Sequence, residues 1–405
     1  MNTRKDTANS MINDYSSRER LLAALNCQTP DYPPCSFMIF GALHQSARSY
    51  IDFVDRQLAM GLDACVMVPP RPPVVINDHY NLYGLPISYH PKVSIVETVQ
   101  KQPGEVEPIL VKTYRTPAGD LTAIVRKTGD WRWGDHVPFL DDYLIPRANK
   151  FILEGPQDLE AFQYLLNPPT DAEIQAFKHE TALVIDYART QELLLTGGWG
   201  VGADMIGWVH GLDHLVFDVY DRPEFICDLL AMIGTWNRQR MTVVLEAGID
   251  LFIKRAWYAN TDFFSPKTWR KLIQPELKKD VDLAHQAGAK FGYIITASAM
   301  PLLEEIAQSS VDVIIGVDPH AYDLQAAKEI LGGRVCLWGG VNGHLTVEHG
   351  SPEIVQEEVA AALDILGPDG LILSPVDNVR EDTPQAMRNV KTLIQTWKER
   401  TGQVG

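Results

Sequence analysis

Aromatic and polar side chains follow a series of short apolar segments, where an α/β protein presents the groups that contact small molecules. Tryptophan, tyrosine and hydrogen-bonding groups dominate this set, and pairs of groups suited to acid–base chemistry are few. Such residues favour an apolar, flat-walled pocket with a few polar groups that orient a ligand. They are His44, Arg48, Arg71, Trp199, Arg255, Trp257, Tyr258, Asn260, Tyr293, Thr296, Ser298, Asp318, His320, Asn342, Asp377, Asn378 and Arg380.

The segments that carry these residues are short runs rich in Val, Ile and Leu, as in strands buried on both faces of a parallel sheet. Amphipathic stretches that end in glycine or Gly-Pro separate them, which is typical of helices. Eight strands alternating with helices predict an α/β fold, specifically a (β/α)8 TIM barrel. An open doubly wound sheet is the alternative, although no Gly-x-Gly-x-x-Gly follows the first strand. The predicted strands are residues 35–40, 63–69, 192–198, 249–257, 290–296, 312–317, 334–340 and 370–375.

Residues 78–170 interrupt the alternation of strands and helices. Within them, "ILVKTYRTPAGDLTAIVRKT" alternates apolar and polar residues around a Pro-Ala-Gly-Asp turn, which predicts an antiparallel hairpin. We expect an inserted β-hairpin arm after the second strand, folded over one mouth of the barrel. Residues 1–15 are polar and predicted to be disordered, and residues 16–400 are predicted to form a single domain.

Charge and cysteine usage limit the partners and the compartment. The formal net charge of −16 argues against nonspecific binding to nucleic acid or to anionic membranes. The five cysteines are scattered and include no Cys-x-x-Cys pair, so we expect free thiols rather than disulfides or a zinc ribbon. The N-terminus has no apolar core of a signal peptide, and no stretch approaches the length of a membrane span. We therefore expect a cytoplasmic protein.

Several stretches resemble the uroporphyrinogen decarboxylase superfamily, in the expected order. They are "GADMIGWVHGLDHLVFDVYDRPEFICDLL", "LEAGIDLFIKRAWYANTDFFSPKTWRKLIQP", "LGGRVCLWGGVNG" and "DTPQAMRNVKTLI". The resemblance covers nearly the whole chain beyond residue 15 and implies a (β/α)8 barrel. It also implies one of two activities: decarboxylation of uroporphyrinogen III, or zinc-dependent methyl transfer to or from a corrinoid protein or a thiol. A homodimer is a further implication for decarboxylase-like members.

The sequence departs from both patterns of this superfamily, as a divergent member would. The arginine-rich segment of the decarboxylases is replaced by "FMIFGALHQSARSY", which has only Arg48, and their strand-2 aspartate lies in a region that here reads "CVMVPPRPP". The His-x-Cys-Gly of the zinc methyltransferases corresponds to residues 294–297, "IITA", and their last cysteine lies close to Asp377. Without thiolate or imidazole ligands there, we expect no tightly bound zinc and assign no metal ligand.

The interpretation that we favour is a methyltransferase-type enzyme. It would move a methyl group between a small substrate, such as a methoxylated aromatic, and a partner protein that carries the corrinoid. The hairpin also resembles the insertion of methyltransferase-like members. Breaking an aryl ether requires a proton or a Lewis acid at the leaving oxygen, where charge develops. The candidates for this role are Asp377, Tyr293, His44 and Arg255. The residues expected to bind the substrate are Arg48, Arg71, Trp199, Trp257, Tyr258, Asn260, Thr296, Ser298, Asp318, His320, Asn342 and Asn378.

Two alternatives remain open at this stage. A lyase acting on a tetrapyrrole or another carboxylate would use Arg48, Arg71, Lys254, Arg255 and Arg380 to hold carboxylates, with Asp318 or Asp377 in proton transfer. A non-catalytic binding barrel is the third interpretation. Cations that converge on the barrel mouth would favour the lyase, whereas an aromatic cavity with the cations directed elsewhere would favour methyl transfer.

Overall fold

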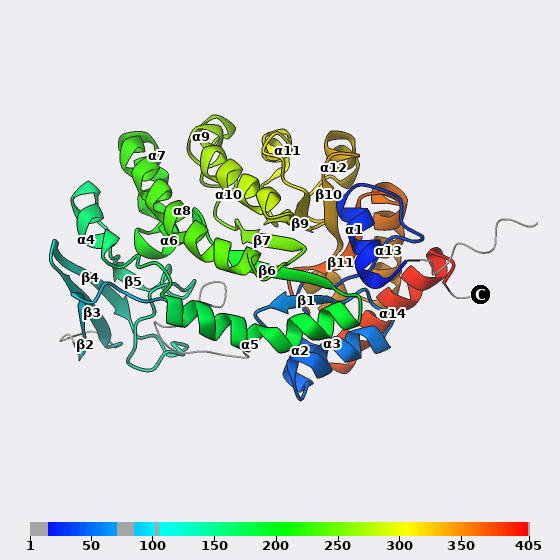
Figure 1. Ribbon diagram of the computed structural model, residues 1–405, viewed down its shortest axis with the longest axis horizontal. Coiled ribbons are helices and arrows are strands. Elements are labelled where there is room, and N and C mark those ends of the chain that lie inside the picture. The colour runs from blue at the N-terminus through cyan, green and yellow to red at the C-terminus, as the bar shows by residue number, and fades with distance from the viewer. Residues whose placement is uncertain (1–14, 71–84, 102–103, 105, 404–405) are drawn as a thin grey trace, which may run out of the picture.

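Seven parallel strands form one curled sheet at the centre of the protein (Figure 1). The computed structural model describes residues 15–70, 85–101, 104 and 106–403. The predicted disordered segment therefore lies, except for its last residue, outside the described part of the chain. In spatial order, the strands are β1 (Cys65–Val68), β6 (Leu194–Gly200), β7 (Leu251–Arg255), β8 (Lys290–Ile294), β9 (Val313–Val317), β10 (Cys336–Asn342) and β11 (Leu371–Val376).

The first predicted strand, residues 35–40, does not join this sheet as a strand. It makes one isolated parallel bridge, between Cys35 and Leu373 of β11, and Cys35 O accepts a hydrogen bond of 2.9 Å from Asp63 N just before β1. The segment thus runs between β11 and β1. Beyond this bridge, the carbonyl of Ser36 accepts the indole N–H of Trp338 at 2.8 Å. The α/β class is confirmed, and the predicted eight-stranded barrel appears as seven strands and this bridge.

Helices follow the strands and cover the outer side of the sheet (Figure 1). Several begin at side-chain caps, in which the hydroxyl of Thr170, Ser351 or Thr383 accepts a backbone N–H of the first turn. Among the described residues, no helix combines the length and apolar composition needed to cross a membrane. The longer helices are α1 (Ser17–Leu25), α3 (Tyr50–Ala59), α5 (Asp171–Thr190), α7 (Leu212–Asp221), α8 (Pro223–Leu245), α10 (Gln274–Gln286), α12 (Leu324–Leu331), α13 (Pro352–Leu366) and α14 (Pro384–Arg400).

Shorter helical turns lie mainly between these elements. They include the π-helical turn η3, which directly follows β10. They are α2 (Gly41–Ser46), η1 (Pro156–Asp158), α4 (Leu159–Gln163), α6 (Asp204–Val209), α9 (Pro266–Leu272), η2 (Met300–Leu302), α11 (Leu303–Ala307) and η3 (Gly343–Glu348).

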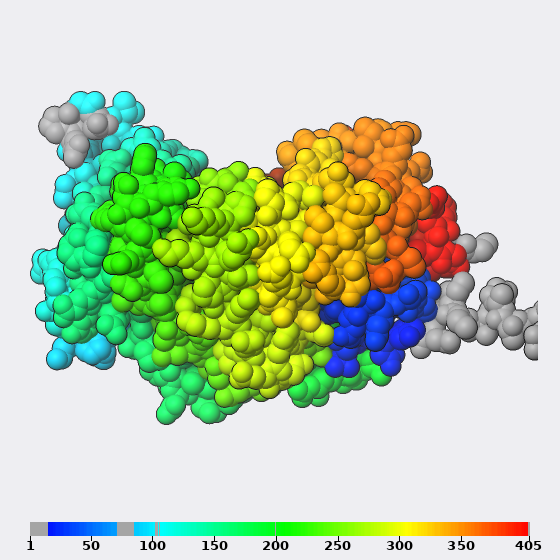
Figure 2. Space-filling view, turned by 90° about the horizontal axis from the view of Figure 1, so that it is seen from above, coloured from blue at the N-terminus to red at the C-terminus, as the bar shows by residue number. Residues whose placement is uncertain are grey.

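The insertion after β1 builds a second, antiparallel sheet. Its four strands are, in order, β2 (Ser94–Gln100), β3 (Ile109–Thr116), β4 (Gly119–Arg126) and β5 (Ala148–Lys150). Strands β3 and β4 pair antiparallel along their whole length around the Pro-Ala turn. In the space-filling view the insertion (cyan) lies at one end of the molecule and the N-terminal and C-terminal segments (blue and red) lie at the other (Figure 2).

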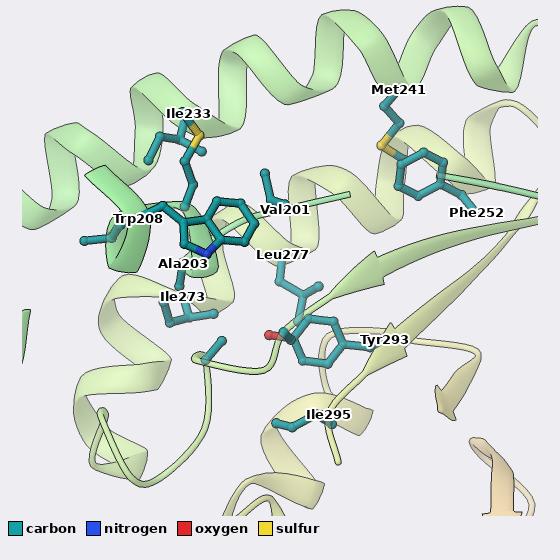
Figure 3. Packing of buried hydrophobic residues seen from close by; sticks show 14 of the residues in the cluster. Val201, Ala203, Trp208, Ile233, Met241, Phe252, Ile273, Leu277, Tyr293 and Ile295 are labelled. Atoms are coloured by element: carbon teal, nitrogen blue, oxygen red, sulfur yellow. The ribbon is translucent and has the colours of Figure 1, made fainter. Parts of the chain in front are cut away.

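Successive residues of the parallel strands point to opposite faces of the sheet, so the core has two layers. Ile253 and Ile294 belong to the cluster inside the curled sheet, together with Trp338. Phe252 and Tyr293 belong to the cluster between the sheet and the helices. Figure 3 shows this outer layer from close by. This alternation decides which strand residues can reach the mouth at the C-terminal ends of the strands.

Candidate functional site

A hollow of apolar and aromatic side chains lies inside the curled sheet, against residues 37–41. Trp338 forms part of it, and the bond from its indole N–H to Ser36 O holds the ring in place. The predicted residue His44 also lines it, with its ring 4.7 Å from that of Phe53. The hollow is built mainly from residues that were not predicted, and Trp257, Tyr258 and Tyr293 are not among them, so the aromatic pocket expected at the strand ends stays a prediction. The lining includes Phe37, Met38, Phe40, His44, Tyr50, Phe53, Cys65, Met67, Thr196, Ile253, Ile315 and Trp338.

Arg255 lies at the end of β7, where two carboxylates engage it. Its Nε is 2.7 Å from Asp204 Oδ2 and its Nη2 is 2.6 Å from Asp142 Oδ1. Its guanidinium also packs over the ring of Trp257, 3.9 Å from the centroid. Burial disfavours its charge, but the two carboxylates outweigh this and raise the pKa of Arg255. Arg255 is therefore a fixed, neutralised cation, which corrects its prediction as a proton donor.

Asp204 ties this ion pair to the backbone of the next loop. Its carboxylate accepts hydrogen bonds from the backbone N–H of Trp257 at 3.2 Å and of Tyr258 at 2.8 Å. The Tyr258 hydroxyl donates to Asp142, which belongs to the insertion, at 2.9 Å. Asp204 thus holds the backbone at Trp257 and Tyr258, and the insertion is bonded to the end of β7. Asp142 and Asp204 were missed because no local spacing links them to Arg255.

Three of the other cations proposed for carboxylate binding are also paired with acids. Lys254 points away from the inside of the sheet and bonds to Asp280 of α10. Arg48 pairs with Asp52 at 3.0 Å, and its side chain is 85% exposed. Arg380 lies 3.6 Å from Glu348. Arg71 lies outside the described residues, and Trp199 lies in β6.

A polar group gathers at the ends of β9 and β10. Asn342 Nδ2 donates to Asp318 Oδ2 at 2.8 Å, and the other oxygen of Asp318 accepts the backbone N–H of His320 at 2.9 Å. The ring of His320 lies 2.9 Å from Glu358 of α13. The structure thus joins Asp318, His320 and Asn342 in one network, although each of these contacts also serves the packing of the loops.

Asp377 follows β11 in a left-handed conformation, with φ of +68°. Aspartate tolerates this region better than most residues, and such outliers are common at functional sites. Burial of its carboxyl raises the pKa of Asp377 above its ordinary value, Arg380 opposes this, and Glu348 and Asp318 add to it. A raised pKa suits a group that must donate a proton near neutral pH.

Three other predicted residues serve the loops themselves. Asn378 Oδ1 accepts the backbone N–H of Gly41 at 2.9 Å and so fastens the segment after residue 40. Asn260 bonds within its own loop, to Trp257 O and Asp262 N. Ser298 donates to Asp262 at 2.8 Å, and Thr296 packs against Gly316.

Tyr293 does not reach the mouth. Its side chain lies between the sheet and the helices, near Leu277 of α10 and Ile295 (Figure 3), and only 1% of the residue is exposed. Burial raises the pKa of its hydroxyl far above the ordinary value. The prediction of Tyr293 as a catalytic residue is wrong because Ile294, its neighbour, takes the inward face of β8.

The residues do not fit the zinc site that the resemblance implies. Ile294 and Thr296 stand where the histidine and cysteine would be, and Asp377 stands near the last position. Cys65 lines the hollow, but burial raises the pKa of its thiol to about 12, which disfavours the thiolate that zinc requires. A different group, His344, Glu348 and His349 of the turn after β10, holds three ligand atoms within 4.8 Å of one another. Sequence reasoning missed it.

Comparisons with known proteins agree with the resemblance. A curated uroporphyrinogen decarboxylase from Chlorobium luteolum is 27% identical over 187 residues, which are 45% of this chain and 51% of that protein. The chain thus spans about half the length of this relative. A methyltransferase from Methanosarcina mazei has the same fold, with a TM-score of 0.58 and 17% identity over 96% of this chain and 99% of that one. The sequence model described as uroporphyrinogen decarboxylase (URO-D) matches residues 146–400, more than half of the chain. The protein is therefore a member of the uroporphyrinogen decarboxylase family.

Proposed function

We propose that this family member is a methyltransferase, which moves a methyl group between a small, flat substrate and a corrinoid carried by a partner protein. The proposal includes a methoxylated aromatic compound as the substrate class. The observation that carries it is the state of the cations. In the described part of the chain, Arg48, Lys254, Arg255 and Arg380 each lie beside a carboxylate of the protein itself.

The charge pattern disfavours a substrate with several carboxylates. Such a substrate would have to displace Asp204 and Asp142 from Arg255, and Asp204 is buried. Breaking a buried ion pair typically costs about 3–5 kcal/mol. Asp318, Glu348 and the net charge of −16 would add repulsion. The charge of this mouth is therefore poorly complementary to that of an octa-anionic tetrapyrrole.

The hollow suits an apolar, planar substrate instead. The rings of Phe37 and Phe40 lie 4.9 Å apart at its wall, and Trp338 offers an indole whose N–H is already bonded. Aromatic walls bind a ring through its faces and edges without requiring charge. Met67 and Thr196 line it from β1 and β6, and the lining that the structure describes includes no lysine or arginine to pair with a carboxylate.

Asp377 is the residue that we propose as the proton donor. When the methyl group leaves an aryl ether, negative charge develops on the oxygen, and a proton donor there lowers the barrier. The raised pKa of Asp377 keeps more of its carboxyl protonated than an ordinary aspartate at the same pH. The corrinoid on the partner would supply the nucleophile that accepts the methyl group.

The test is a paired assay on one preparation of the protein. The first reaction offers methoxylated aromatics with cob(I)alamin and follows methylcobalamin by absorbance; the second offers uroporphyrinogen III and follows the release of CO2. We expect methyl transfer that Asp377→Asn abolishes and that Asp364→Asn, an exposed ion-paired carboxylate on α13, leaves intact. Decarboxylation without methyl transfer would establish the lyase instead, and failure in both reactions would favour a non-catalytic binding barrel.

A further inference from the structure

We propose that His344, Glu348 and His349 form a binding site for one divalent transition-metal ion, with zinc as the reference case. Two imidazoles and a carboxylate are common ligands of zinc. The ligand atoms that they offer lie within 4.8 Å of one another. This site differs in position from the zinc site implied by the family resemblance, and it does not depend on the proposed methyl transfer.

The π-helical turn η3 is what brings these residues together. Its hydrogen-bonding pattern spans five residues rather than four, so the turn is wider than an α-helical one. His344 and His349, five residues apart, consequently face each other with ring centroids 4.5 Å apart. In a regular α-helix, residues with this spacing do not lie on one face. Single π-helical turns occur frequently at functional sites.

The carboxylate of Glu348 is held in place from behind. Its side chain is 0% exposed, and Oε1 accepts the backbone N–H groups of both Arg380 and Glu381. This leaves Oε2 directed at His344, whose Nδ1 is 2.9 Å away. Hydrogen bonds that orient a ligand in this way are typical of metal sites, where they fix the ligand before the ion arrives.

The present contacts of His344 leave one atom with competing partners. Its Nδ1 lies 2.9 Å from Glu348 Oε2 and 3.2 Å from Arg380 Nη2. A ring nitrogen cannot donate a proton to the carboxylate and accept one from the guanidinium at once. A metal ion resolves this, because the lone pairs of both Nδ1 and Oε2 can point at the ion. The side chain of Arg380 is 53% exposed and can turn to solvent.

The distances require only small side-chain movements. Bond lengths of about 2.0–2.2 Å to a tetrahedral ion separate the ligand atoms by roughly 3.3 Å. The pair of His344 and Glu348 is already near this value, and His349 and His344 are about half exposed, so their rings can adjust. Glu381, with an oxygen 3.9 Å from His349 Nε2, offers a fourth ligand.

The turn lies close over the mouth. A side chain at Gly343 would place its Cβ 2.3 Å from the carbonyl oxygen of Val376, so η3 packs tightly on the end of β11, next to Asp377. An ion bound here would therefore lie on the rim where the polar strand ends gather. Its binding can nevertheless be measured without any substrate.

The experiment titrates chelator-stripped protein with Zn2+ by calorimetry and with Co2+ by visible absorption. We expect one site per chain in the wild type. The Kd should be weaker by about tenfold or more in His344→Gln and in His349→Gln, because losing even a residue that only orients a ligand lowers metal affinity by about 10–100-fold. The matched control is His285→Gln, because this histidine is partly exposed and pairs with Asp312, away from the cluster. Its Kd should equal that of the wild type.

Two further measurements distinguish a built site from adventitious binding. Arg380→Gln removes the competing cation and should tighten the site severalfold, while Zn2+ should raise the melting temperature of the wild type but not of His344→Gln. Weak binding that neither histidine variant changes, or an Arg380→Gln variant that binds more weakly, would overturn the proposal. Failure of methyl transfer would leave these results unaffected, so the two proposals can be judged separately.

Discussion

Replacement of Arg255 by methionine tests how the mouth is held together. Asp204 is fully buried, and Arg255, with a side chain only 9% exposed, is bonded to it. Methionine keeps much of the arginine stem, so the contacts with Trp257 are partly retained, whereas the positive charge is lost. The variant therefore isolates the consequence of leaving Asp204 without its cation.

The expected loss is large. Removing one partner of a buried ion pair typically costs about 3–5 kcal/mol, because the remaining charge stays desolvated. Asp142 also loses a bond, but its side chain is 40% exposed and water replaces part of that contact. We therefore expect Arg255→Met to lower the free energy of unfolding by about 3–5 kcal/mol near neutral pH, and Arg255→Met/Asp204→Asn to lose less than the sum of the two single changes.

The loss should depend on pH with a defined sign. Burial raises the pKa of Asp204, and Arg255 opposes this. Without Arg255 the pKa of Asp204 rises further. A carboxyl whose pKa is higher in the folded than in the unfolded protein contributes stability below its unfolded pKa and loses it as the pH rises through the folded pKa. The difference between variant and wild type should therefore be smaller at pH 5 than at pH 8.

Urea unfolding, followed by fluorescence after reversibility has been verified, measures this directly. The control is Arg48→Met, which removes an exposed pair with Asp52 and should cost no more than about 0.5 kcal/mol. A loss of less than about 1 kcal/mol in Arg255→Met, or a loss that does not change between pH 5 and pH 8, would refute the buried ion pair as the support of this loop.

Three further predictions concern single residues. Asp377→Asn should abolish methyl transfer. In a pH–rate profile of the wild type, the rate should fall as the pH rises through the pKa of Asp377, which lies above the ordinary value of aspartate. Tyr293→Phe should change the rate less than about twofold, because the hydroxyl faces the helices; a loss of tenfold or more would contradict this position. Burial lowers the pKa of Lys112 in β3 to about 6, so above pH 6 the unfolded chain binds more protons than the folded protein. The free energy of unfolding should therefore rise with pH, by at most about 1.4 kcal/mol per pH unit. Urea unfolding at pH 6–9 should show this rise in the wild type and a flatter dependence in Lys112→Met.

The positions of the parallel strands were predictable from sequence, but their inward faces were not. Runs such as residues 290–296 are apolar at nearly every position because both faces of these strands are buried. With no alternation, sequence offers no rule for choosing between Tyr293 and Ile294 as the inward residue. The first predicted strand makes only a single bridge to β11, and its Ser36 carbonyl is bonded to Trp338, 302 residues away, a contact that no local pattern indicates.

The candidate site could be predicted only where it depends on strand ends. Asn342 ends its strand and Asp318 and Asp377 directly follow theirs, and the structure places them at the expected edge. Asp142 could not be found in this way, because it reaches Arg255 from an insertion 113 residues earlier. The candidate metal ligands at η3 could not be predicted from the α-helical repeat of 3.6 residues. Only the wider π-helical turn brings His344 and His349 onto one side.

Membership of the uroporphyrinogen decarboxylase family determines the scaffold, whereas the side chains at the mouth decide the chemistry. A polycarboxylate substrate needs cations that are free to meet it, and here Arg255 is neutralised by two carboxylates of the chain itself. Asp142, one of these carboxylates, comes from the insertion, so the same segment that distinguishes this chain from a compact barrel also removes the cation from use. The insertion therefore takes part in setting the charge of the mouth, and this charge is the basis on which we propose a flat substrate without several carboxylates.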